Sequence, residues 1–271
     1  MTVGAVTEER VLPFVGIHNF RDYGGYATAN GGRLKTGVLF RSGQHVGATT
    51  EDLAAIAALD LQIVIDLRGN SERRSYPCAR PEGFGAAVHF FDGETAGRGG
   101  APHVEAVREI TGAGDAHRAM VALYAFMPFR PNLIAVMQMY FEALAERDGA
   151  HLLHCLAGKD RTGLAAALLH TLMGVHPDDM MTDYLLTNTA GNSEARIAAG
   201  AASIRASRGP QISDDAIRIL MGVDEAFLDA ALSAIVAEHG SVEGYARNVL
   251  GVTPERRAQI AGRIIDRKSV V

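Results

Sequence analysis

The segment AHLLHC, residues 150–155, has the pattern of a short buried strand that runs directly into a tight turn and an apolar helix. The turn is LAGKD, and the helix covers residues 164–174, with Gly174 as its expected C-terminal cap. A strand that enters a helix through so short a turn is typical of α/β folds. The turn follows Cys155, one of only two cysteines in the chain. This junction therefore constrains the fold class and indicates where chemistry is expected.

The chain before this junction also alternates between helical and strand patterns. Residues 49–52, TTED, are typical of a helix start and lead into an apolar helix over residues 53–59. The run LQIVIDLR, residues 61–68, has the nearly continuous apolar character of a buried parallel strand. A further strand is predicted over residues 86–91 and a long amphipathic helix over residues 132–147. The pattern predicts an α/β fold with a mostly parallel central sheet flanked by helices.

The C-terminal third of the chain is almost entirely helical in pattern. A helix is predicted to start at Pro177, and Asp224 and Ser241 are the expected N-caps of two further helices that end in glycine. No composition typical of a linker separates this region from the rest. We therefore predict a single domain over residues 1–271, in which residues 177–271 form a helical extension.

Residues 93–117 differ from their surroundings because they are rich in glycine and poor in core residues. This composition predicts a mobile insertion. A surface loop is the simpler interpretation, and a lid over a functional site is the alternative, because insertions of this length often have a function.

Composition excludes several classes of protein. The formal net charge is −5 and there is no long basic run, which disfavours nucleic acid as a partner. No apolar stretch reaches the roughly 18 residues of a membrane span, and the acidic N-terminus does not resemble a signal peptide. We expect a cytoplasmic protein without integral membrane association, while export without a signal peptide stays open. Cys78 and Cys155 are too few and too far apart to indicate a disulfide framework.

The turn after Cys155 has the properties of an anion site. Its backbone N–H groups, those of Leu156, Ala157, Gly158, Lys159 and Asp160, would point inward at a helix N-terminus, where an anion is stabilised. Arg161 adds a planar guanidinium that matches two phosphate oxygens. The same field favours a thiolate on Cys155, so we expect this cysteine to be a nucleophile that receives a phosphoryl group. Thr162 is expected to donate a hydrogen bond to the sulfur, and His154 to orient the loop through backbone contacts.

The segment HCLAGKDRTG, residues 154–163, resembles the signature HCxxGxxR[ST] of the cysteine-dependent protein tyrosine phosphatase superfamily. More narrowly, the chain is similar to the bacterial tyrosine phosphatase family that includes the mycobacterial phosphatase B. The segments that match this pattern in order are NFRDYGGYAT (19–28), GVLFRSGQ (37–44), VIDLRGNSE (64–72) and EHGSVEGYARNVLGV (238–252). The resemblance implies a three-layer phosphatase fold, no metal or other cofactor, and activity on phosphotyrosine. Lys159 and the AGK core also resemble the loop of phosphoinositide phosphatases, which implies phosphoinositide or phosphoserine substrates.

The general acid that protonates the leaving oxygen has three candidates, because the chain has no tryptophan and hence no tryptophan-proline-aspartate loop. Asp66 ends a predicted parallel strand, where active sites of open α/β sheets gather. Asp160 lies in the phosphate loop, and Asp92 follows the strand at residues 86–91. The resemblance favours Asp66 and Asp160, and we place Asp66 first. The alternative for Asp66 is an ion pair with a nearby arginine.

Other charged residues in the matching segments have a predicted structural role. Arg21 with Asp22, and Arg41 with Ser42, are expected to form buried Arg and Asp pairs that brace the N-terminal segment against the sheet. Arg68 and Glu72 could form a similar pair. Cys78 could trap oxidised Cys155 as a disulfide, although an ordinary loop cysteine is the simpler interpretation.

These observations predict a cysteine-dependent phosphatase that acts on phosphotyrosine, with phosphoserine, phosphothreonine and phosphoinositides as further substrates and inorganic phosphate as product. Two other functions fit a similar loop. One is a non-catalytic phosphate-binding module, which the presence of both Cys155 and Arg161 disfavours. The other is sulfur transfer of the rhodanese type, which the surrounding HCxxGKxRTG pattern disfavours.

Overall fold

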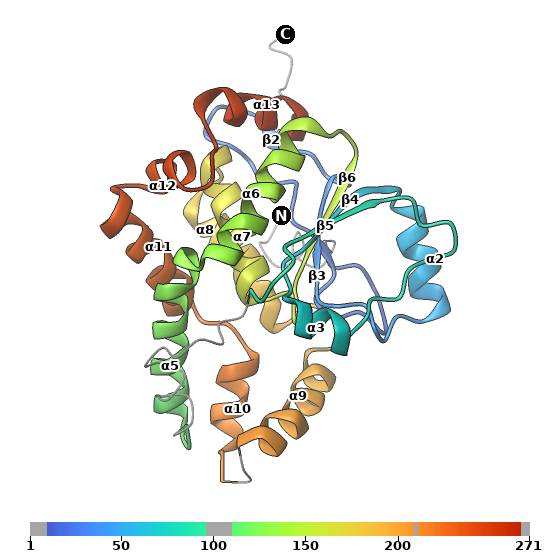
Figure 1. Ribbon diagram of the computed structural model, residues 1–271, viewed down its shortest axis with the longest axis vertical. Coiled ribbons are helices and arrows are strands. Elements are labelled where there is room, and N and C mark those ends of the chain that lie inside the picture. The colour runs from blue at the N-terminus through green and yellow to red at the C-terminus, as the bar shows by residue number, and fades with distance from the viewer. Residues whose placement is uncertain (1–9, 96–109, 209–210, 267–271) are drawn as a thin grey trace.

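The computed structural model describes residues 10–95, 110–208 and 211–266 and has an α/β architecture (Figure 1). A five-stranded sheet has the order β1-β3-β6-β4-β5, in which β1 is antiparallel to β3 and the other pairs are parallel. The predicted fold class is therefore confirmed. The strands are β1 (Arg21–Asp22), β3 (Leu39–Ser42), β6 (Ala150–His154), β4 (Leu61–Asp66) and β5 (Ala87–Phe90).

Alternating side chains of the central strands point to two different cores, as expected for a buried sheet. On one face, Ile63 and Ile65 join a large cluster with α6 (Pro131–Glu146) and α7 (Asp160–Met173). On the other face, Val64 packs with Ile56 of α2 (Thr50–Ala58) and with the N-terminal segment. The sheet is thus the middle of three layers, and Figure 1 shows α2 and α6 on opposite sides of it.

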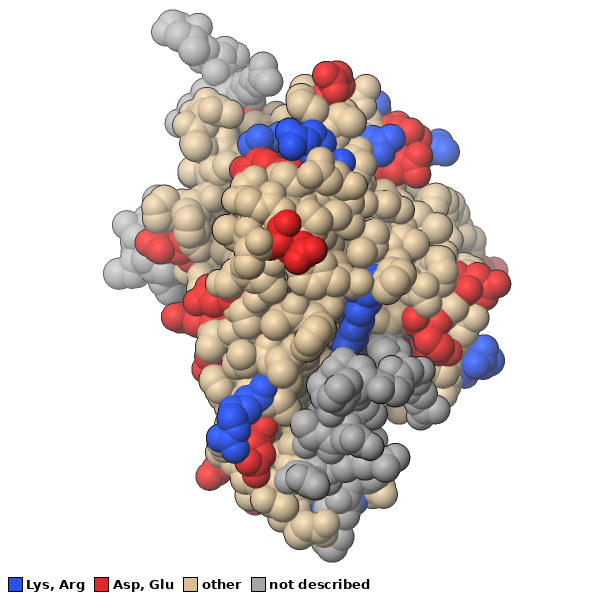
Figure 2. Space-filling view, turned by 60° about the vertical axis from the view of Figure 1, so that its left-hand side comes forward, with Lys and Arg blue, Asp and Glu red and all other residues tan. Residues whose placement is uncertain are grey.

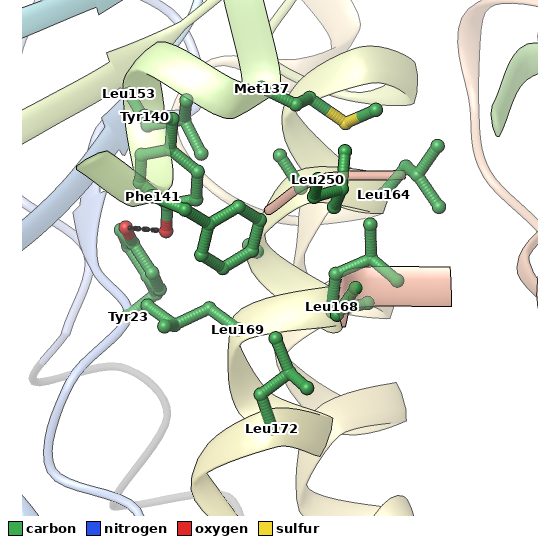
Figure 3. Packing of buried hydrophobic residues seen from close by; sticks show 14 of the residues in the cluster. Tyr23, Met137, Tyr140, Phe141, Leu153, Leu164, Leu168, Leu169, Leu172 and Leu250 are labelled. Carbon is green, nitrogen blue, oxygen red and sulfur yellow. Dashed lines mark hydrogen bonds between the residues drawn. The ribbon is translucent and has the colours of Figure 1, made fainter. Parts of the chain in front are cut away.

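The large cluster also holds the C-terminal helices against the sheet layer. Figure 3 shows leucines of α7 packed with Phe141 and Leu250, beside a hydrogen bond of 2.8 Å between the hydroxyls of Tyr23 and Tyr140. The helices of this region are α8 (Pro177–Leu185), α9 (Ser193–Arg208), α10 (Asp214–Met221), α11 (Glu225–His239), α12 (Val242–Asn248) and α13 (Pro254–Ile264), with a short 3-10 turn, η3 (Leu186–Asn188).

Local sequence signals explain most helix ends. Thr49 caps α2 in a capping box with Asp52, and the side chains of Asp224 and Ser241 cap α11 and α12 as predicted. Gly174 ends α7 in the left-handed conformation, with φ of +75°. The expected strands and helices are therefore confirmed, with small shifts of their ends.

Several elements were not predicted. They include α3 (Asn70–Ser75), and β2 (Arg33–Leu34), which pairs with β7 (Ile265–Asp266) after the last helix. The predicted insertion at residues 93–117 extends too far toward the C-terminus, because α5 (Ala113–Phe126) already begins at Ala113. Residues 96–109 of that segment lie outside the described residues. A 3-10 turn, η2 (Met127–Phe129), connects α5 to α6.

None of the described helices is by itself long and apolar enough to cross a membrane; α5 with η2 and α6 passes that test only as a pair bent by 62°. The face drawn in Figure 2 shows basic and acidic side chains interspersed among other residues, rather than a basic patch.

Candidate active site

The turn between β6 and α7 lies at the carboxyl end of the parallel strands, with Cys155 almost fully buried at its start. Two of its carbonyls are turned away from the turn's centre. The oxygen of Leu156 accepts the backbone N–H of Gln44 at 3.0 Å, and that of Gly158 accepts Asn19 Nδ2 at 2.8 Å and Arg41 Nη2 at 3.1 Å. The backbone N–H groups of residues 156–161 have no acceptor among the described residues. The turn therefore has the unpaired N–H groups that the predicted anion site requires, and anion binding there stays a prediction.

Gly158 is required for this shape on two grounds. Its φ is +68°, a conformation that costs other residues about 1–2 kcal/mol. A Cβ atom at this position would lie 2.4 Å from the backbone carbon and oxygen of Ser42. The turn thus packs directly on the end of β3, and only glycine permits that approach.

Arg161 is held in place by Glu72, which the sequence analysis paired with Arg68 instead. Arg161 Nη1 and Nη2 donate to the two carboxylate oxygens of Glu72, each at 2.6 Å, and Nη1 also lies 3.0 Å from Thr95 Oγ1. Burial lowers the pKa of Arg161, but the hydrogen bonds to Glu72 and the charges nearby outweigh burial and raise it overall. Arg161 Nε–H has no acceptor among the described residues. The guanidinium is thus fixed with a donor left for a ligand.

Cys155, Asp160 and Arg161 line one pocket of about 400 Å³. A larger hollow of about 460 Å³ lies beside α13 and holds none of the predicted site residues, so we place the candidate site in the Cys155 pocket. The other residues of the Cys155 pocket are His18, Gly43, Gln44, Tyr76, Leu156, Ala157, Lys159, Arg196, Ala199, Gly200, Ile204 and Met221.

Asp160 is the only one of the three candidate acids in this pocket's lining. Its Oδ1 accepts the hydroxyl of Tyr124 at 2.8 Å and lies 3.2 Å from Lys159 Nζ. Tyr184 in turn donates to the Tyr124 hydroxyl at 2.8 Å. Because the contacts of Tyr124 and Lys159 both involve Oδ1, the second carboxylate oxygen of Asp160, Oδ2, is left for a ligand or a proton.

Lys159 connects the loop to the helical extension. Its ammonium donates to the carbonyl oxygens of Leu220 at 2.6 Å and Gly222 at 3.0 Å, at the C-terminal end of α10. With Asp160 as the third neighbour, its three N–H donors have acceptors within the protein. Its charge therefore serves first to join the loop to α10.

Asp66, the acid placed first from the sequence, is found in the alternative arrangement, a buried ion pair. Arg68 Nε and Nη2 donate to its two carboxylate oxygens at 2.8 and 2.7 Å. Burial raises the pKa of Asp66, but the charge of His154 and the contacts of Arg68 outweigh it, and the pKa is lowered. A carboxylate that is outside the pocket's lining and resists protonation is a poor proton donor.

Asp92 also lies outside the lining of the Cys155 pocket. It accepts a hydrogen bond of 2.8 Å from Asn70 Nδ2 and lines a different surface hollow with Arg73, Arg74 and Phe90. Neither Asp66 nor Asp92 therefore lines the Cys155 pocket, although Asp66 lies beside the turn, with Oδ2 3.7 Å from His154 Nε2.

His154 makes the contact expected from the sequence, whereas Thr162 does not. His154 Nδ1 lies 3.3 Å from the carbonyl oxygen of Cys155, in line with the predicted backbone contact. Burial lowers the pKa of His154 to about 4, so its ring is neutral at pH 7. Thr162 is fully buried and its hydroxyl makes no hydrogen bond in the described structure, so the predicted bond to the sulfur is not formed.

The N-terminal brace exists, but its acid is Asp183 of α8 and not Asp22. Arg21 Nε and Arg41 Nη1 donate to Asp183 at 3.1 and 2.6 Å, and all three side chains are buried. Asp22 instead accepts the backbone N–H groups of Gly24 and Gly37. Asp183 lies far along the chain in a helix, so no local pattern pointed to it.

Both cysteines are free. Cys78 Sγ accepts a hydrogen bond from Arg68 Nη2 at 3.2 Å and from the His45 backbone N–H at 3.4 Å. Its predicted redox role stays a prediction. In the described ranges, no three His, Cys, Asp or Glu side chains are grouped as a metal site.

Comparison with known proteins shows similarity over most of the chain. A model described as the tyrosine phosphatase family matches residues 12–266. A Cupriavidus necator protein provisionally named tyrosine-protein phosphatase is 34% identical over 248 residues, which cover 89% of this chain and 84% of that protein. The triple specificity protein phosphatase PtpB of Mycobacterium tuberculosis is 29% identical over 266 residues, covering 88% and 93%. A tyrosine-protein phosphatase of Nostoc commune is 27% identical over 224 residues, covering 80% and 70%.

Proposed function

This chain belongs to the tyrosine phosphatase family, and on that premise we propose that it hydrolyses phosphotyrosine through a cysteinyl-phosphate formed on Cys155. The observation that carries the proposal is the pocket in which Cys155, Asp160 and Arg161 meet below a turn of unpaired N–H groups. The N–H groups and Arg161 bind the three non-bridging phosphate oxygens and stabilise the charge that they carry during transfer.

In the first step, the Cys155 thiolate attacks phosphorus, the bond between phosphorus and the tyrosine oxygen breaks, and Asp160 gives its proton to the departing oxygen. In the second step, water attacks phosphorus and passes a proton to the Asp160 carboxylate. The sulfur–phosphorus bond breaks, so the thiolate is restored and inorganic phosphate leaves. Asp160 is assigned this role because it lines the pocket and Asp66 does not.

Phosphoserine, phosphothreonine and phosphoinositides stay predicted substrates. The name of the M. tuberculosis relative, a triple specificity phosphatase, supports a broad substrate range. Lys159 adds little support for inositol phosphate substrates, because its ammonium already donates to the carbonyl oxygens of Leu220 and Gly222. Lys159 therefore does not offer a free charge that would attract an inositol phosphate.

Substitution of the two cysteines tests the mechanism. We expect Cys155→Ser to lower turnover of p-nitrophenyl phosphate and of a phosphotyrosine peptide by at least about a thousandfold. Inorganic phosphate should still bind in calorimetry, because backbone groups and Arg161 form the anion site. Cys78→Ser is the matched control and should keep its turnover. The covalent mechanism is wrong if Cys155→Ser keeps substantial turnover or if acid-quenched wild-type enzyme carries no phosphate on Cys155. A phosphate-binding module without activity would turn over neither substrate.

A further inference from the structure

Arg196 of α9 differs from the other buried arginine and lysine side chains of the described residues, because it has no carboxylate partner there. Arg196 is 5% exposed. The others each lie within 4 Å of an aspartate or glutamate; they are Arg21, Arg41, Arg68, Lys159 and Arg161. A buried charge without a counter-ion is costly, so its persistence calls for an explanation.

The protein groups that contact Arg196 are neutral. Its Nη1 donates to the carbonyl oxygen of Met221 at 2.6 Å, and its Nη2 lies 3.3 Å from the carbonyl oxygen of Thr187. The first contact places the guanidinium at the C-terminal end of α10, where a cation is favourable. These two bonds use part of a guanidinium that has five N–H donors. They orient the side chain but leave its charge without a paired anion.

The side chain of Arg196 lines the same pocket as Cys155, so the free donors are available to a bound substrate. Burial lowers the pKa of Arg196, while the charge of Asp160 acts in the opposite direction. Burial and then the charge of Arg196 lower the pKa of His18, which lines the same pocket. Asp160 already contacts Lys159, so it does not serve as a dedicated partner for Arg196.

The same face of α9 continues as an apolar wall. Ala199, Gly200 and Ile204 follow Arg196 at spacings of three, four and eight residues, which puts them on one side of the helix, and all of them line the pocket. Met221 of α10 adds to this wall. A ligand that lies along α9 would thus meet an apolar surface suited to an aromatic ring and then a buried cation.

We propose that Arg196 binds a carboxylate of the peptide substrate, supplied by an Asp or Glu close to the phosphotyrosine. This inference rests on the proposed function, because it assumes that the phosphotyrosine ring occupies the Cys155 pocket. The planar guanidinium matches a carboxylate in shape and charge. The enzyme therefore prefers phosphotyrosine peptides that carry an acidic neighbour.

Matched peptides test the preference in the full-length enzyme. Each pair differs only by Glu or Gln, placed in turn at the two positions on either side of phosphotyrosine. At the position that reaches Arg196, wild-type kcat/KM should favour Glu by about tenfold, as for one hydrogen bond to a charged group. Arg196→Gln should bring this ratio close to one, whatever its effect on kcat/KM for the Gln peptide and for p-nitrophenyl phosphate. Arg196→Lys should keep part of the preference.

Arg205→Gln is the matched control, because Arg205 lies on the same helix and pairs with Asp214 at the surface. It should keep the full preference. The proposal is overturned if wild-type enzyme shows no preference at any position, a result that does not depend on the folding of any variant. It is also overturned if Arg196→Gln lowers turnover of Glu and Gln peptides equally, which would indicate that Arg196 only holds α9 to α10. If the dependence on Arg196 appears only with bisphosphorylated inositol headgroups, the second anion is a phosphate and the peptide assignment is wrong. These outcomes differ from a failure of the proposed phosphatase activity. In that case phosphotyrosine peptides would not be hydrolysed, or Cys155→Ser would stay active.

Discussion

Arg161 and Glu72 form a two-pronged ion pair in which each Nη atom of the arginine lies 2.6 Å from one carboxylate oxygen. The pair joins the start of α7 to α3, the helix that follows β4. Burial raises the pKa of Glu72, but the hydrogen bonds and charge of Arg161 outweigh it and lower the pKa overall. Glu72 thus remains ionised at neutral pH and fixes the plane of the guanidinium.

Glu72→Gln should lower kcat/KM for phosphotyrosine peptides by about 10- to 100-fold, because a guanidinium that loses one of its two charged contacts is less well oriented toward phosphate. Steady-state kinetics measures the change. Glu94→Gln is a suitable control, since Glu94 contacts Ser71 at the surface and not Arg161. Equal kinetics for Glu72→Gln and wild type would show that the orientation of Arg161 does not depend on this pair.

Asp160→Asn should slow phosphotyrosine hydrolysis by about a hundredfold or more, and p-nitrophenyl phosphate hydrolysis much less, because a general acid matters most for a basic leaving oxygen. The basic limb of the pH profile of kcat/KM should also flatten. Asp92→Asn should leave both substrates unaffected, because Asp92 lies in another hollow. If Asp66→Asn shows the dependence on the leaving group and Asp160→Asn does not, the assignment of the acid to Asp160 is wrong.

Gly158→Ala should abolish phosphatase activity, because the added Cβ cannot fit 2.4 Å from the backbone of Ser42 and the turn must change shape. Gly37→Ala separates this clash from the cost of the backbone conformation. Gly37 has a φ of +74°, but no atom lies within 4 Å of an added Cβ. It should lose about 1–2 kcal/mol of unfolding free energy and keep its activity. Thermal unfolding and turnover measured on both variants test the expectation, and an active Gly158→Ala would contradict it.

Stability should fall as the pH is lowered from 6.5 toward 4. Burial lowers the pKa of His154 from 6.5 to about 4, so within this window the unfolded chain binds a proton that the folded chain does not. The free energy of unfolding should therefore fall by up to about 1.4 kcal/mol per pH unit for this residue. Burial also lowers the pKa of His45, His151 and His170, which adds to the same trend.

Urea unfolding at several pH values measures this slope. His154→Asn should make the slope shallower between pH 6.5 and 4, whatever its effect on the absolute stability. His176→Asn, at an exposed helix cap, serves as the control. An unchanged slope in His154→Asn would mean that this imidazole does not contribute to the acid sensitivity.

The sequence by itself predicted the parts of this protein that depend on neighbours along the chain. The strand–turn–helix junction at residues 150–174 follows from an apolar run, a glycine and a helix pattern, which all act within a few residues. The caps at Thr49, Asp224 and Ser241 are local in the same sense. For this reason the sequence also located Cys155, Asp160 and Arg161 at one turn, and the structure has them line one pocket.

The choice of partner among charged side chains was decided only by the tertiary structure. Arg68 could have paired with Glu72 or Asp66, and the fold gives Asp66 to Arg68 and Glu72 to Arg161. Arg21 of β1 and Arg41 of β3 meet Asp183 only because the fold brings α8 within reach of these two strands. A buried carboxylate is stabilised by whichever cation the packing of distant elements brings within reach, and charge alone does not identify it in advance. The sequence therefore supplied the reactive residues, whereas long-range packing determined which carboxylate is held in an ion pair and which one faces the pocket.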